Sequence, residues 1–337
     1  MSEVGRPAEY PSPVLGGVDV PRAEEVAPVT FIGGTGRSGT HILAQLLRRN
    51  ERFALVPVEV RFHTDPDGFP GLLAGEVTLK RFMKRLRGFW WKGFQRTRFR
   101  GMYRFVDRER FDAAAARFEE TFEEEREAAC RRLFFDLLAF RMDERKGDTR
   151  GIIEQSCDTV AQAATLTRIF PDARFIHVVR DGRDASASRV AQTHGLLRPR
   201  TREQGIAWWL ERIQAIERGA DSIAPDRLLT VSLDELLRVE LGRVALRPLF
   251  RFVGAHASTG PRRFFKNHMS HDQANAERWR RDISERRAAR IERLYVEALE
   301  RLEADGARCA PLLRRTYERA ADPELPALIY VYDRSPK

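Results

Sequence analysis

The stretch FIGGTGRSGTH, residues 31–41, constrains the fold of this chain more than any other feature. It follows an apolar run and opens onto HILAQLL, whose apolar residues recur at helical spacing. Strand, glycine-rich turn and helix in this order can hold an anion, because glycines let backbone N–H groups approach closely and the helix N-terminus adds unpaired donors. The stretch therefore predicts a site for a phosphate or a sulfate ester, in preference to a tight turn that binds nothing.

The same stretch lacks the residues that a nucleotide triphosphatase needs. In that kind of P-loop a Lys follows the last glycine, and the next residue is a Ser or Thr held on Mg²⁺. Gly34 and Gly39 keep the glycine spacing, but Thr40 and His41 occupy those two positions. The loop carries one cation, Arg37, in its middle. A P-loop kinase or nucleotide hydrolase stays open as an alternative, and it predicts Mg²⁺-dependent turnover of ATP.

Strand-like and helix-like segments alternate along the chain. Strand-like runs lie at 29–34, 52–62, 151–155 and 173–179. Helical patterns lie at 40–50, 159–170 and 184–192. We expect an α/β fold with a P-loop-like parallel sheet flanked by helices and a helical cap insertion at about 65–145. The expected boundaries are a disordered tail at 1–28, the main domain at 29–320 and a C-terminal extension at 321–337.

The charge of the chain points to anionic partners. Lys and Arg number 59 against 49 Asp and Glu, which gives a net charge of +10. Such an excess favours anionic small molecules, nucleic acid or a membrane surface. Residues 80–105 interleave basic and aromatic side chains, as in segments that stack on bases or lie among lipid headgroups. A nucleic-acid-binding or membrane-surface module is therefore a second alternative; nucleic acid is the less favoured partner, and residues 80–105 are the candidate for peripheral membrane contact.

The cysteines and histidines do not form a metal motif. Cys130, Cys157 and Cys309 have no CxxC spacing, and HMSH at 268–271 is not a zinc pattern. We therefore expect no metal. An odd number of cysteines suits a reducing compartment, and no apolar run reaches transmembrane length, so we expect a cytoplasmic protein.

A second informative stretch is ARFIHVVRDGRDASASRV. Arg180 leaves the carboxyl end of a strand, Gly182 turns the chain, and Ser188 falls inside the following helix. Ligands of open α/β sheets bind outside the carboxyl ends of the strands. Arg180 and Ser188 are therefore candidates to meet an anion at the same sheet edge as the glycine-rich turn. The alternative is a solvated turn in which acidic residues only cap a helix.

Together, GTGRSGT and VVRDGRDASAS resemble the two nucleotide-binding signatures of sulfotransferases that use 3′-phosphoadenosine 5′-phosphosulfate (PAPS). The resemblance runs from about residue 29 to 300 and favours the bacterial and tyrosylprotein-sulfotransferase-like branch. It implies that the first signature holds the 5′-phosphosulfate and the second holds the 3′-phosphate. The donor-binding residues it implies there are Gly34, Thr35, Gly36, Arg37, Ser38, Gly39, Thr40, His41, Arg180 and Ser188.

The resemblance also assigns roles within these signatures. Arg37 would meet the bridging oxygen of the departing sulfuryl group, and would therefore be catalytic. In VPVEVRF, Glu59 and Arg61 match an acidic residue followed two positions later by Arg, and the acidic residue is the general base in the relatives. A carboxylate can take the proton of an acceptor hydroxyl. The alternative is that Glu59 only forms a structural ion pair with Arg61 or with another of the many arginines. His63 and His271 are the reserve candidates for the base.

The segment SHDQANAERWRRDI, residues 270–283, resembles the part of the family that closes over the nucleotide. The resemblance implies a catalytic contact with the sulfuryl or phosphate group from Ser270. It implies a closing segment formed by Arg278, Trp279 and Arg280. The alternative is that these residues form an arginine-rich face of a helix.

One position departs from the family pattern. Relatives often carry a Lys before the second signature, and IIEQSCDT places Gln155 there, with Cys157 in place of a Pro. Glutamine donates hydrogen bonds but carries no charge. The departure leaves open whether Gln155 lowers the rate or whether Arg37 or another arginine replaces the lysine.

These observations predict a PAPS-dependent sulfotransferase that releases 3′-phosphoadenosine 5′-phosphate (PAP). Its mechanism would parallel phosphoryl transfer, in which positioning and charge stabilisation do most of the work. The sequence does not identify the acceptor: hydroxyls of carbohydrates, lipids, peptide tyrosines and small natural products all fit.

Overall fold

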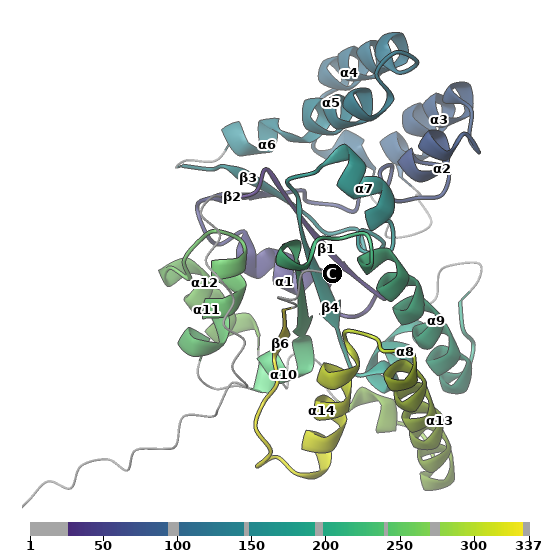
Figure 1. The fold of residues 1–337 in the computed structure, drawn as a ribbon, viewed down its shortest axis with the longest axis vertical. Coiled ribbons are helices and arrows are strands. Elements are labelled where there is room, and N and C mark those ends of the chain that lie inside the picture. The colour runs from purple at the N-terminus through teal and green to yellow at the C-terminus, as the bar shows by residue number, and fades with distance from the viewer. Residues whose placement is uncertain are drawn as a thin grey trace, which may run out of the picture.

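The computed structural model of the protein describes residues 26–93, 101–144, 148–192, 198–238, 242–269 and 277–332. A six-stranded sheet runs through these residues in the spatial order β2-β3-β1-β4-β5-β6 (Figure 1). The strands are β1 (Val29–Gly34), β2 (Phe53–Leu55), β3 (Gly151–Glu154), β4 (Arg174–Val179), β5 (Leu228–Ser232) and β6 (Tyr330–Val331). β6 is antiparallel to β5 and the other neighbouring pairs are parallel. The predicted α/β fold is confirmed.

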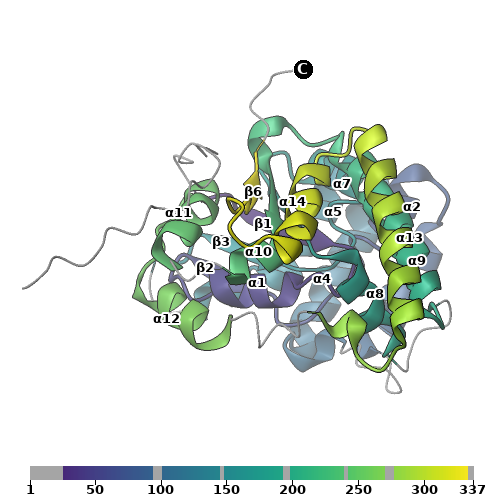
Figure 2. The ribbon, with the colours of Figure 1, turned by 90° about the horizontal axis from the view of Figure 1, so that it is seen from below.

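Helices cover both faces of the sheet. The α-helices are α1 (Thr40–Leu47), α2 (Phe69–Ala74), α3 (Leu79–Arg85), α4 (Arg108–Thr121), α5 (Arg126–Leu138), α6 (Phe140–Asp143), α7 (Ala163–Ile169), α8 (Gly182–Val190), α9 (Arg202–Ala220), α10 (Leu233–Arg238), α11 (Gly242–Phe252), α12 (Thr259–His268), α13 (Glu285–Ala304) and α14 (Ala310–Ala321). A π-helix, η1 (Leu86–Trp90), and three 3-10 turns, η2 (Met102–Arg104), η3 (Pro225–Arg227) and η4 (Arg278–Arg280), complete the helical elements. Figures 1 and 2 show α9 and α13 side by side at one flank and α11 and α12 at the other.

The alternation of side chains along the strands builds the core on both faces. In β1, Phe31 packs with residues of α2–α5 and α7, whereas its neighbour Ile32 packs with α1 and α10–α12. Successive residues of a strand point to opposite faces, so a strand buried on both sides is apolar throughout. All six residues of β1 are buried. Because β1 pairs with both β3 and β4, the carboxyl ends of these three strands share one sheet edge.

The second strand is shorter than its apolar pattern predicts. The strand expected over 52–62 ends at Leu55, after three residues. Pro57 follows, and it has no N–H to continue a sheet ladder. Arg61 has a φ of 59°, in the left-handed region, and its carbonyl accepts hydrogen bonds from Thr64 and Asp65. The pairing therefore ends after Val56, whose N–H donates to the Ile153 carbonyl at 2.9 Å, and Glu59 then contacts Cys157 in the turn after β3.

Residues 65–145, where a cap was expected, contain α2–α6 in their described part. The aromatic residues that suggested a nucleic-acid or membrane surface lie mostly in the core here: Phe82 and Trp90 are fully buried and Trp91 is 9% exposed. Trp90 also donates a hydrogen bond of 2.9 Å to the Asp65 carboxylate. These three rings are therefore not available to stack on bases, whereas Tyr103 is 51% exposed. Residues 94–100 lie outside the described part, and contact of 80–105 with a membrane stays a prediction.

No helix in the described ranges has the length and apolar character needed to cross a bilayer. The segment 321–337, expected as an extension, supplies β6 to the sheet, with Val331 beside Thr230 and Tyr330 beside Val231. The expected tail at 1–28 lies outside the described residues up to position 25.

Candidate functional site

The glycine loop, residues 34–40, connects β1 to α1. Gly34 is packed so closely that an added Cβ would lie 2.2 Å from the Ser38 hydroxyl and 2.7 Å from the Val178 carbonyl oxygen. Gly36, Arg37 and Gly39 have φ values of 79°, 65° and 94°. Three left-handed residues in so short a loop curl the backbone around its own centre. The loop geometry therefore depends on glycine at the first position and places Arg37 in an uncommon conformation.

The interior of the glycine loop contains an unsatisfied polar group. The Ser38 hydroxyl is fully buried and has no hydrogen-bond partner within the described residues. A buried hydroxyl normally has a partner, because losing one costs about 1–3 kcal/mol. The first N–H groups of α1, which begins at Thr40, also lack partners within the helix itself. These donors fit an anionic group bound in the loop.

The second signature meets the glycine loop directly. Arg37 donates a hydrogen bond from Nε to the Ser188 hydroxyl at 2.9 Å, across 151 residues of sequence. Arg180 donates from Nη1 to the carbonyl oxygen of Arg37 at 3.3 Å. The strand ends of β1 and β4 hold the two segments together, since Gly34 and Val178 are register partners. The structure therefore brings together Arg37, Arg180 and Ser188, as the two sequence signatures predicted.

Positive charge gathers at this junction. Partial burial, followed by the like charges of Arg180, Arg278 and Arg189, lowers the pKa of Arg37. Burial is the larger cause of the lowered pKa and the three neighbouring arginines add to it, while the guanidinium itself stays charged. Crowded cations around a loop of backbone donors favour a ligand with several negative charges.

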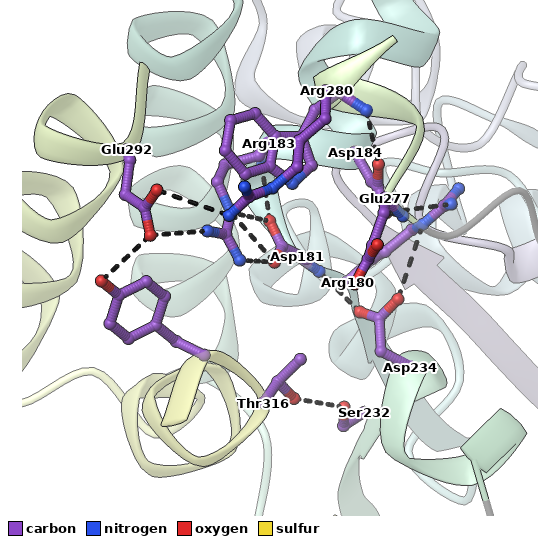
Figure 3. A network of polar contacts seen from close by, with 12 residues as sticks. Arg180, Asp181, Arg183, Asp184, Ser232, Asp234, Glu277, Arg280, Glu292 and Thr316 are labelled. Atoms are coloured by element: carbon purple, nitrogen blue, oxygen red, sulfur yellow. Dashed lines mark hydrogen bonds and ion pairs between the residues drawn. The ribbon is translucent and has the colours of Figure 1, made fainter. Parts of the chain in front are cut away.

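Buried carboxylates fix the position of Arg180 (Figure 3). Its guanidinium lies 3.8 Å from Asp184 and 3.8 Å from Asp234. Asp234 also accepts a hydrogen bond of 2.7 Å from the backbone N–H of Asp181. Burial, together with the neighbouring Asp181 carboxylate, raises the pKa of Asp184 to about 7. Asp184 and Asp234 thus orient Arg180 from the protein side, while the Asp181 carboxylate pairs with Arg183.

The described part of the predicted closing segment contains the 3-10 turn η4 (Arg278–Arg280). Trp279 is 2% exposed, and its ring faces the Arg183 guanidinium at 4.7 Å. The backbone N–H of Trp279 donates a hydrogen bond to the Asp184 carboxylate at 3.0 Å. Arg280 lies over the Trp279 ring and 3.6 Å from Glu292 on α13. The contacts of Trp279 and Arg280 therefore anchor the segment on α8 and α13, and their contact with a nucleotide stays a prediction.

Arg278, in the same segment, contributes to lowering the pKa of Arg37 through its positive charge. The other two predicted residues of the closing stretch, Ser270 and the reserve base His271, lie outside the described residues.

Glu59 lies beside the turn that follows β3. Its Oε1 accepts a hydrogen bond from the Cys157 thiol at 3.6 Å. Burial raises the pKa of Glu59, the Arg61 charge opposes the rise, and the Glu154 carboxylate adds to it. Arg61 also forms an ion pair with Asp65, at 2.8 Å. Burial and the Glu154 charge therefore give Glu59 the raised pKa of a candidate base, although the Arg61 charge acts against the rise.

Cys157 joins Glu59 to the glycine loop. Its carbonyl oxygen accepts a hydrogen bond of 2.9 Å from the N–H of Gly34, and its sulfur lies 4.0 Å from the Thr40 hydroxyl. Burial and the Glu59 carboxylate raise the pKa of the thiol to about 12. A thiol held protonated is a weak hydrogen-bond donor and a poor nucleophile. Cys157 therefore positions Glu59 next to the loop.

Gln155, at the position where the resemblance leads us to expect a Lys, contacts His41 at the N-terminal end of α1. It is 3% exposed, and its Oε1 lies 3.2 Å from Nδ1 of His41, which can donate a hydrogen bond to it. A buried neutral amide and an exposed imidazole thus occupy the place of a lysine.

The reserve base His63 is fully buried among aromatic rings, and its Nε2 lies 3.0 Å from the Glu154 carboxylate. Glu154 in turn accepts hydrogen bonds from the N–H and hydroxyl of Ser156. His63 is therefore a core residue, which argues against its serving as the base.

Three residues near the site were not found from the sequence. Asp234 comes from α10 and holds the start of α8. Arg212 on α9 pairs with Asp158 and, through its charge, acts on Cys157. Arg189 directly follows Ser188 and acts on Arg37. Only Arg189 had a sequence signal, its place in the second signature.

The described ranges contain no group of three or more His, Cys, Asp and Glu residues that could hold a metal ion.

Comparisons with known proteins identify the family of the chain. A family model described as the sulfotransferase family matches residues 28–259. A sulfotransferase domain from the Synechococcus PCC 7002 olefin synthase is similar in structure, with a TM-score of 0.50, 17% identity, and coverage of 85% of this chain and 98% of that domain. The sulfotransferase domain from the curacin biosynthetic pathway has a TM-score of 0.48 and 12% identity, covering 83% and 99% of the two chains. A sulfotransferase from Mycobacterium avium has a TM-score of 0.41 and 15% identity, and the match covers 82% of this chain and 77% of that protein. No curated protein sequence matches the chain.

Proposed function

The chain belongs to the sulfotransferase family, and we propose that it transfers the sulfuryl group of PAPS to a hydroxyl of an acceptor by in-line displacement. The observation that carries the proposal is the hydrogen bond of 2.9 Å between Arg37 and Ser188. It joins the two segments that would hold the two ends of the same donor. A single anion needs only one of them, whereas PAPS carries negative groups at both its 5′ and 3′ positions.

The glycine loop would hold the 5′-phosphosulfate. The buried, unpartnered hydroxyl of Ser38 and the tight packing at Gly34 support an anion in this loop. The N–H groups of Ser38, Gly39 and Thr40 would meet the 5′-phosphate, with Thr35, Gly36 and His41 completing the loop. Backbone donors at a helix N-terminus suit this task, because they need no reorganisation.

Arg180 and Ser188 would hold the 3′-phosphate. The carboxylates around Arg180 support this role because they fix its guanidinium before the ligand arrives. Arg278, which adds to the positive potential at Arg37, would also face the donor.

In the proposed reaction the acceptor oxygen forms a bond to sulfur while the bond between sulfur and the bridging phosphate oxygen breaks. The electron pair stays on the leaving phosphate, which becomes PAP, and the acceptor proton passes to Glu59. Arg37 would stabilise the charge that develops on the bridging oxygen. Charge stabilisation of this kind is commonly the largest catalytic contribution.

Glu59 is the proposed base because it combines position with a raised pKa. The Cys157 thiol ties it to the turn that receives Gly34, so it lies near the loop that would hold the sulfuryl group. Burial makes the carboxylate more basic than an exposed one. A general base contributes roughly 10²–10⁴ in rate when it is well placed. We propose no metal for this step.

The acceptor class stays open among carbohydrates, lipids, peptide tyrosines and small natural products. The free cysteines Cys130, Cys157 and Cys309 support a proposed cytoplasmic location, because reduced thiols suit that compartment. The branch of the family proposed here is the bacterial one.

Thermal unfolding with added nucleotide tests the donor. PAP should raise the melting temperature, since a ligand that binds the folded state stabilises it by mass action. Stabilisation by Mg²⁺-ATP without an effect of PAP would instead indicate a kinase or hydrolase. A screen of acceptors with radiolabelled PAPS then identifies the hydroxyl class.

A further inference from the structure

A second, separate cavity lies at the β2 edge of the sheet. Its volume is about 630 Å³, and it opens between α12 and α6, next to the residues that follow α1. Figure 1 shows α6 and α12 on either side of β2, which is the edge strand. The wall combines guanidinium and apolar groups from Arg48, Arg49, Arg141, Arg263, Leu55 and Phe264.

This cavity is distinct from the proposed donor site. The glycine loop precedes the first residue of α1, whereas Arg48 and Arg49 follow its last residue. Eight residues of α-helix span about 12 Å, so the two sites lie at opposite ends of this helix. None of the residues that line the cavity belongs to the glycine loop or to α8.

The cavity wall has an excess of positive charge. Four arginines line it, and Glu144 is the acidic residue among its lining residues. Glu144 pairs with Arg141, whose Nε is nevertheless buried without a hydrogen-bond partner in the described part of the chain. Arg49 is held over the Phe264 ring at 4.9 Å, an arrangement that orients its guanidinium by a cation–π contact. Among the described residues that line the cavity, four guanidinium groups therefore face one carboxylate.

We propose that this cavity binds a small oligoanion, a molecule that carries at least two adjacent phosphate or sulfate groups. Guanidinium groups match the oxygens of phosphate and sulfate with paired hydrogen bonds. An excess of three positive charges exceeds what one singly charged group would balance. The volume lies within the range of about 300–1,000 Å³ that small-molecule sites occupy. Leu55 and Phe264 would contact the uncharged part of the ligand.

Calorimetric titration of the full chain with inorganic pyrophosphate tests the site. Arg49→Glu with Arg263→Glu reverses two exposed charges of the wall. The matched control is Arg286→Glu with Arg290→Glu, which makes the same change on the exposed face of α13. We expect affinity to fall about tenfold or more in the cavity variant, because each charge-assisted hydrogen bond contributes about 1.5–3 kcal/mol. The control should bind like the unmodified chain, and any binding in the glycine loop affects both variants equally.

Equal affinity in the cavity variant and the control would overturn the proposal. If the cavity variant melts at a lower temperature than the unmodified chain, the titration is repeated with the double variant Arg49→Gln and Arg263→Gln. An unchanged affinity of that variant for pyrophosphate would also overturn the proposal. Cosedimentation with vesicles that contain phosphatidylinositol bisphosphate distinguishes a lipid headgroup from a free oligoanion. Sedimentation that is lost in the cavity variant, together with pyrophosphate binding, supports the site with a lipid source. Pyrophosphate binding that depends on the arginines without sedimentation supports a free ligand.

Discussion

The substitution Glu59→Gln separates a catalytic carboxylate from a structural one. It keeps the size of the side chain and its ability to accept a hydrogen bond from the Cys157 thiol, which lies at 3.6 Å. It removes the ability to take a proton. We therefore expect sulfotransferase turnover to fall by roughly 10²–10⁴, while the affinity for PAP stays within about twofold.

The same substitution should not destabilise the fold at neutral pH. Burial raises the pKa of Glu59, so the native state prefers the protonated acid. A carboxyl group whose pKa is higher in the native state than in the unfolded state contributes to stability while it is protonated in both states, below its unfolded pKa. This contribution is lost as the pH rises from the unfolded pKa through the native pKa. Each unit of raised pKa corresponds to about 1.4 kcal/mol. The neutral glutamine avoids that loss, so its advantage in free energy of unfolding should grow as the pH rises above about 4.5, the ordinary value.

Two measurements check this reasoning. Urea unfolding at pH 5 and pH 8 gives the free energy of unfolding of both proteins, and pH–rate profiles of turnover give the acid limb, which should disappear in the variant. Glu127→Gln is the matched control, because Glu127 on α5 has a side chain that is 41% exposed and pairs with Arg168 on α7. It should leave turnover unchanged. Loss of stability at pH 8 and of PAP affinity in Glu59→Gln would refute a catalytic role and indicate a structural ion pair.

Two further substitutions test the supporting structure. Gly34→Ala should abolish PAP binding, because the new methyl would lie 2.2 Å from the Ser38 hydroxyl and 2.7 Å from the Val178 carbonyl oxygen; retained affinity by calorimetry would contradict the loop geometry. Trp279→Ala should lower the free energy of unfolding by about 3–5 kcal/mol, since it removes a buried ring that faces Arg183; a loss below 1 kcal/mol in urea unfolding would show that Trp279 is not an anchor.

Much of the sheet could be predicted because its central strands are fully buried. A short run such as VTFIGG, which has no charged residue and contains Val, Phe and Ile, favours a strand that is covered on both faces. The second strand was predicted too long. The apolar residues of 52–62 suggested one continuous strand, but β2 ends at Leu55, before Pro57 and the left-handed Arg61. Backbone conformation at a non-glycine residue has no signal in a single sequence.

Contacts within the candidate site were predictable where two motifs lie at the ends of neighbouring strands. The meeting of Arg37 with Arg180 and Ser188 followed from that arrangement. The orientation of Trp279 did not, because a tryptophan between arginines reads equally as a ligand contact or a core ring. Asp234 belongs to a distant element that only the packed fold brings close, as do the four arginines of the second cavity.

The central claim is that the glycine loop and the second signature hold the two ends of the same donor. Calorimetric titration with PAP and with adenosine 5′-monophosphate, which lacks the 3′-phosphate, tests it most directly. The account predicts that the unmodified chain prefers PAP by roughly tenfold or more, and that Arg180→Ala with Ser188→Ala removes this preference while affinity for the monophosphate changes little. Equal losses for both nucleotides, or a preference for PAP that survives in the double variant, would contradict it.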